Sequence, residues 1–172
     1  MSTIQKQTQN QDDQALDEAL DLVSARFADL VAQDYQQRLI EDITRQLFQA
    51  DSELELAEEL VRALAQRCGE HRLLYLGLDE LGVAPVVYGK GFAADPRVPR
   101  LPGRSLFSTC QGYLLDQQTL STVLADDLPS TSGLRLHFQS TTLALVCMER
   151  TPTDSMLVDF LERIGERASQ AL

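Results

Sequence analysis

Three cysteines are the residues of this chain that could act as nucleophiles or redox groups: Cys68, Cys110 and Cys147. A thiol becomes reactive when a cationic neighbour or a helix N-terminus favours its thiolate. Cys147 lies in the apolar stretch TTLALVCMER (141–150), among Leu145, Val146 and Met148, which disfavour a thiolate, so we expect an inert core thiol there. Cys110, in the more polar sequence before Gly112, is the better candidate for a reactive or pocket-facing thiol.

The two histidines, His71 and His137, stand far apart in the sequence. Neither has partners at the spacing that zinc or haem ligation needs. We therefore expect surface or strand-edge histidines, no metal site and no cofactor.

Four basic residues gather within a proline-rich stretch of an otherwise acidic chain: Lys90, Arg97, Arg100 and Arg104. A basic loop of this kind can hold an anion, a nucleotide phosphate or an acidic partner helix. The alternative is a solvated loop whose arginines pair with the acidic surface of the same chain. Both interpretations remain open from the sequence.

Aromatic residues on the predicted strands are candidates for lining a ligand cavity together with Cys110. They are Tyr88, Phe107, Tyr113 and Phe138. Aromatic residues on strands also serve simple packing, so their presence alone does not decide between a pocket and a core.

The overall composition excludes several classes of protein. Among 172 residues there are 26 acidic and 15 basic ones, which gives a formal net charge of −11. Such a chain repels phosphate, so we expect no nucleic-acid partner. It has no apolar run of about 18 residues and no secretion signal at its start, so we expect no membrane span. The odd number of widely spaced cysteines is typical of reduced thiols in the cytoplasm.

The N-terminal third of the chain predicts a long helix. Residues 1–11 are rich in Gln, Thr and Asn, which indicates a disordered lead-in. From 12 to 49 there is no Gly or Pro, and apolar residues recur at steps of three and four. The first part keeps a heptad rhythm, and the later part shifts to steps of four, which predicts a break or a change of winding near Asp34. We therefore divide the chain into a helical, coiled-coil segment at 12–34 and a domain at 35–172.

The domain itself predicts an α+β fold. Ser52 and Glu55 form the pattern of a capping box before a second helix, and Gly69 supplies a left-handed stop after it. Strand-like runs follow at 71–80, 86–92, 105–115, 119–128, 134–138 and 141–150, and a helix follows from Pro152 to the C-terminus. This order predicts an antiparallel sheet of about six strands with the N-terminal and C-terminal helices packed on one side.

The apolar stripes of the two terminal helices are candidates for a homodimer interface. In the first helix the candidates are Leu16, Leu20, Val23, Phe27 and Leu30, and in the last helix they are Leu157, Leu161, Ile164 and Ala168. A helix of about 38 residues is too long for a small domain to cover, which favours a partner helix.

The pattern of residues 35–172 resembles the GAF domain, a small-molecule sensing module of bacterial signalling proteins. The resemblance is carried by the helix pair at 35–69, by HRLLYLGLDE (71–80), by LADDL (124–128) and by the closing strand and helix from Ser140 to Leu172. It implies a six-stranded, PAS-like sheet, dimerisation through long helices and relay of a state to an output element.

Three functions follow as hypotheses. The first is a non-enzymatic regulatory module that homodimerises through its terminal helices and senses a small ligand or docks a partner protein. The second is a protein–protein adaptor with a degenerate pocket, which the short segment from Gly103 to Gly133 favours because it leaves little room for a lid helix. The third is a thiol enzyme similar to the GAF-related free methionine sulfoxide reductase, with Cys110 as nucleophile, although the cysteine spacing of that enzyme is not present.

Overall fold

The computed structural model describes residues 3–69, 72–79, 86–91, 112–121, 132–139 and 141–172. Contacts within the chain divide it into two compact units, Met1–Leu39 and Ile40–Leu172. The first unit is the N-terminal part of helix α1. The second unit contains the end of α1, the sheet and the remaining helices.

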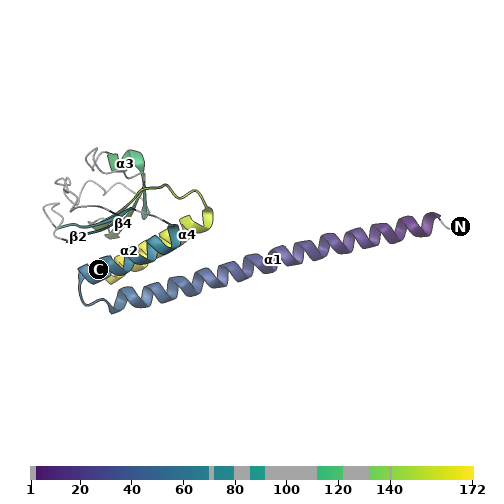
Figure 1. Ribbon diagram of the computed structural model, residues 1–172, viewed down its shortest axis with the longest axis horizontal. Helices are drawn as coiled ribbons and strands as arrows, with labels where there is room; N and C mark the ends of the chain where they lie inside the picture. Colours follow the sequence, from purple (N-terminus) through teal and green to yellow (C-terminus); the bar gives the residue numbers. More distant parts are fainter. Residues whose placement is uncertain (1–2, 70–71, 80–85, 92–111, 122–131, 140) are drawn as a thin grey trace. The chain divides into compact units, whose positions relative to one another are not determined.

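Helix α1 (Thr3–Gln49) is one continuous helix of 47 residues (Figure 1). It begins within the segment for which we expected a disordered lead-in, and it continues through Asp34, where we expected a break. The absence of Gly and Pro before Gln49 removes the usual causes of a kink. An ion pair of 2.9 Å between Arg38 and Asp34, one turn apart, spans the expected break.

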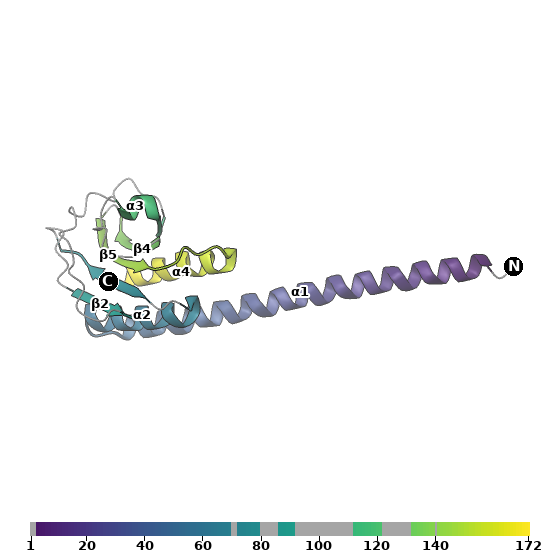
Figure 2. The same ribbon diagram turned by 45° about the horizontal axis from the view of Figure 1, so that its top comes forward.

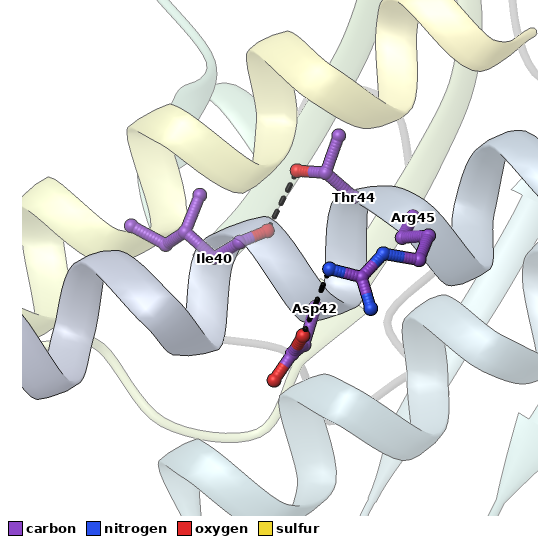
Figure 3. A network of polar contacts seen from close by, with 4 residues as sticks. All are labelled: Ile40, Asp42, Thr44 and Arg45. Atoms are coloured by element: carbon purple, nitrogen blue, oxygen red, sulfur yellow. Dashed lines mark hydrogen bonds and ion pairs between the residues drawn. The ribbon is translucent and has the colours of Figure 1, made fainter.

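The end of α1 belongs to the second unit and is amphipathic. Ile40, Ile43 and Leu47 follow at steps of three and four and are buried. The hydroxyl of Thr44 donates to the carbonyl oxygen of Ile40 at 2.6 Å, and Arg45 pairs with an exposed carboxylate, that of Asp42, at 3.5 Å (Figure 3). One side of this last part of the helix therefore packs in the core, and the other side faces solvent.

Helix α2 (Glu53–Cys68) has the ends that its sequence predicts. The amide of Glu55 donates to Ser52 Oγ at 3.2 Å, and the carboxylate of Glu55 accepts from the amide of Asp51 at 2.8 Å. Gly69 ends the helix at a φ of 62°, a conformation that glycine adopts without strain. The predicted cap and the predicted stop are both confirmed.

The structure describes five strands in one antiparallel sheet of order β2-β1-β5-β4-β3. They are β1 (Leu73–Gly77), β2 (Val86–Lys90), β3 (Leu114–Asp116), β4 (Ser132–Phe138) and β5 (Thr141–Met148). The apolar stretch at 141–150 forms the central strand, β5, as we expected from its composition.

A short helix, α3 (Gln117–Ser121), stands where we expected a strand from residue 119 onward. The carboxylate of Asp116 accepts from the amide of Thr119 at 2.8 Å. This bond ends β3 and starts the helical turn, and it lowers the pKa of Asp116. A side-chain cap of this kind outweighs the strand preference of the residues that follow.

Helix α4 (Ser155–Ala171) begins at Asp154, whose carboxylate accepts from the amide of Met156 at 3.1 Å. Helices α2 and α4 lie together on one side of the sheet and α3 lies on the other (Figures 1 and 2). The predicted α+β fold with an antiparallel sheet is confirmed, and the helices before and after the sheet, α2 and α4, share one side of it as we expected. Within the described residues, no helix combines the length and the apolar character needed to cross a bilayer.

Candidate functional site

Two consecutive residues of β4, Gly133 and Leu134, contact different helices and so distinguish the two faces of the sheet. A Cβ placed on Gly165 of α4 would lie 3.0 Å from the side chain of Leu134, so Leu134 faces the helices. A Cβ placed on Gly133 would lie 2.9 Å from the side chain of Leu120 of α3, so Gly133 faces the other way. We call the face that Gly133 shares the distal face.

The strand register gives the other members of the distal face, because residues directly opposite each other share a face. They are Leu74, Leu76, Gly133, Arg135, Leu145 and Cys147, and all are buried. The burial of Cys147, at 3% exposed, confirms the expected core thiol.

Arg135 is the one charged side chain that is buried among the residues the structure describes, at 2% exposed. Its Nε donates to the hydroxyl of Thr142 at 2.9 Å, and Thr142 is itself buried. A buried guanidinium is costly unless its donors are satisfied. Arg135 and Thr142 therefore form a polar centre on an otherwise apolar face.

Sequence reasoning missed this centre. In LRLHF the alternation of apolar and polar residues suggested that Arg135 points to solvent with His137. Alternation indicates which residues share a face, but it does not show whether the second face is also covered. The small residue Gly133 is the available signal, since it allows the close approach of Leu120 on that face.

Tyr113, a predicted pocket residue, and His137, which we expected at a surface or strand edge, are brought together at the edge of the sheet. Their rings stack with centroids 4.7 Å apart. The carboxylate of Glu162 accepts from the amides of Tyr113 and Leu114 at 3.3 and 3.4 Å. Burial, and then the charges of Glu166 and Glu162, raise the pKa of the Tyr113 hydroxyl. These contacts attach α4 to β3 and serve packing.

The other predicted pocket residues do not meet at one site. Tyr88 is paired with Tyr75, whose hydroxyl donates to the carboxylate of Glu53 on α2 at 3.0 Å. The register therefore places Tyr88 on the face that α2 covers. Phe138 is 63% exposed at the end of β4. Phe107 and Cys110 lie outside the described residues, so the reactive-thiol hypothesis stays a prediction.

The predicted anion or partner site is only partly described. Lys90 is exposed at the end of β2, while Arg97, Arg100 and Arg104 lie outside the described residues. His71 also lies outside them. Across the described ranges, no group of three or more His, Cys, Asp or Glu side chains gathers as a metal site would require.

Neither of two well-formed pockets that described residues line lies on the distal face. A cavity of about 120 Å³ adjoins Cys68, Met148 and Leu157, which is small compared with the cavities of about 300 Å³ or more that hold organic ligands. A more open hollow of about 430 Å³ lies between the end of α1 and α2. Its polar lining is already engaged in part, since Arg62 pairs with Glu59 at 2.6 Å.

The two predicted dimer stripes differ in their exposure to solvent within the single chain. In α1, Leu16, Leu20, Val23, Phe27 and Leu30 are between 55% and 67% exposed. In α4, Leu161, Ile164 and Ala168 are 0% exposed and belong to the core beneath the sheet, with Leu157 half-buried. The α4 stripe is therefore not available to a second chain, which corrects that part of the interface we expected.

Comparison with solved structures identifies the class of fold. Neither a protein-family model nor a curated protein matches this sequence. A methyl-accepting chemotaxis protein segment is similar at a TM-score of 0.54 and 16% identity, over 78% of this chain and 95% of that one. A GAF domain from an Acinetobacter phosphoenolpyruvate-protein phosphotransferase is similar at 0.52 and 13%, over 80% and 94%.

The chromophore-binding domain of the Stigmatella aurantiaca bacteriophytochrome in the Pr state is similar at a TM-score of 0.57 and 16% identity. That match covers 79% of this chain and 59% of the bacteriophytochrome chain. The chain thus has a GAF-like α+β fold. This confirms the resemblance drawn from the sequence pattern, at the level of the fold.

Proposed function

We propose that this protein is a non-enzymatic regulatory module of the GAF-like type that homodimerises through helix α1. The observation that carries the proposal is the exposed apolar stripe of five residues, Leu16, Leu20, Val23, Phe27 and Leu30. Exposed apolar side chains in a row at heptad spacing are unfavourable in water and are typical of a helix that pairs with another.

The second unit is the regulatory part in this proposal. Solved structures with a similar fold include a segment of a methyl-accepting chemotaxis protein and a bacteriophytochrome chromophore-binding domain, which supports a signalling role. Lys90 and the basic residues near it suit an acidic partner surface. We propose that a ligand or a docked protein acts on this sheet and biases the packing of the helices.

Native mass spectrometry of the full chain, purified gently from its source cell, tests the proposal. We expect an assembly of two copies. A retained small molecule would support ligand sensing, and a bound acidic protein would support the adaptor function. A bare monomer at every concentration would contradict the proposal.

An activity assay distinguishes the thiol-enzyme hypothesis from the non-enzymatic role that we propose. Turnover of free methionine sulfoxide with a thiol donor, abolished in Cys110→Ser, would contradict a non-enzymatic role. We expect no turnover above the reaction without protein.

A further inference from the structure

The exposed stripe of α1 defines a seam with clear boundaries. Counted in heptads, Leu20 and Phe27 occupy a positions, and Leu16, Val23 and Leu30 occupy d positions. The a position before the stripe holds Asp13 and the one after it holds Asp34. Asp34 is exposed and paired with Arg38 of its own helix at 2.9 Å. The seam therefore has five apolar positions and ends at an aspartate in each direction.

We propose that two copies of the chain pair through this seam in parallel and in register. The inference rests on the proposed homodimerisation and specifies its geometry. The partner is a second copy because the seam of an identical helix has the same length, the same side-chain order and the same polar ends.

The number of apolar layers favours the parallel arrangement. In a parallel pair in register, each of the five seam residues meets its own counterpart, which gives five apolar layers. In an antiparallel pair a positions face d positions, so at most four layers are apolar. In that case either Leu16 would face Asp34 or Leu30 would face Asp13. A parallel shift by one heptad leaves only three apolar layers.

The residues that flank the seam bring like charges together only at its two ends. In a parallel pair the g position of one helix approaches the following e position of the other. Arg26 would then lie beside Val31, and Ala19 beside Ser24. Neither of these pairs joins like charges. Like charges do meet at the two ends of the seam, where Asp12 would lie beside Asp17 and where Asp13 and Asp34 would each face their own counterpart. The apolar layers therefore decide the orientation.

Cysteine cross-linking in the full chain tests the orientation. Leu16→Cys and Leu30→Cys, each made alone, should form a disulfide with the same residue of a second copy under mild oxidation. A mixture of Leu20→Cys and Leu30→Cys chains should give no link between positions 20 and 30. In a parallel pair these positions are about 15 Å apart along the axis, beyond the reach of about 7 Å of a disulfide. Peptide mass mapping separates these links from those of the native cysteines.

Ala25→Cys provides the matched control, since Ala25 is exposed on α1 but lies off the seam. It should give few cross-links or none. A link between positions 20 and 30, or loss of both self-links in a protein that still sediments as a dimer, would overturn the parallel arrangement and leave the dimer intact. A monomer without any cross-link would overturn the proposed homodimer as well.

Discussion

Polar side chains inside this domain are held by specific partners from other elements. The hydroxyl of Tyr75, on β1, donates to Glu53 at the start of α2, and Nε of Arg135 donates to Thr142 on the neighbouring strand. Burial first, and then the charge and hydrogen bond of Glu53, raise the pKa of Tyr75. Such a shift links the stability of the fold to pH.

Tyr75 should make the fold less stable in alkali. Below pH of about 10 its hydroxyl is protonated in both the folded and the unfolded chain, so its contribution is fully present. As the pH rises past about 10 only the unfolded chain releases this proton, and stability is lost by about 1.4 kcal/mol per pH unit. Urea unfolding should therefore show wild type losing its advantage over Tyr75→Phe between about pH 8 and pH 11.

Tyr35→Phe controls for the substitution, because Tyr35 is 66% exposed on α1. If wild type differed from Tyr75→Phe by the same free energy of unfolding at both pH values, the burial of the Tyr75 hydroxyl would not have the effect that we assign to it.

Among the elements, α4 joins the sheet through small residues as well as apolar ones. Ser169 donates to the carbonyl of Gly165 at 2.7 Å and accepts from the amide of His137 at 3.0 Å. Gly165 lies against Tyr113 and Leu134, and a Cβ at this position would be 2.8 Å from the Cβ of Tyr113. The helix therefore needs glycine here for a close approach.

Gly165→Ala should lower stability, although alanine is the better helix former by about 1 kcal/mol. The new methyl group would force α4 away from β3 and β4, at a cost of about 1–3 kcal/mol in the free energy of unfolding. Chemical denaturation of both proteins measures the difference. A variant as stable as wild type would show that α4 moves without cost.

The elements also show what the sequence could predict. Caps and stops depend on neighbouring residues, so Ser52, Glu55 and Gly69 were predictable, as was the apolar central strand β5. The partner of an amphipathic helix is not local information. The α4 stripe packs on the sheet of its own chain, while the α1 stripe stays exposed, and both have the same pattern in the sequence.

In the candidate site, too, the features that the sequence did not predict depend on contacts between distant parts of the chain. The register that pairs Tyr88 with Tyr75, and so places it beneath α2, is set by contacts between strands. The burial of Arg135 depends on what covers the distal face. Neither property follows from alternation along a single strand.

At the scale of the molecule, the chain combines a GAF-like domain with a helix that has an apolar stripe of its own. The domain buries its apolar residues internally, in the sheet and in helices α2 and α4. The stripe from Leu16 to Leu30 remains in water in a single chain. In the proposed dimer a second copy of the chain covers this stripe.

Sedimentation equilibrium of the full chain over a range of concentrations tests this claim most directly. Wild type should reach twice the mass of one chain. Phe27→Asp, which places a charge in the middle of the seam, should weaken dimerisation at least about a hundredfold. Ala28→Asp adds the same charge at an exposed position off the seam and should dimerise like wild type. Equal association of all three proteins, or a monomeric wild type, would contradict the account.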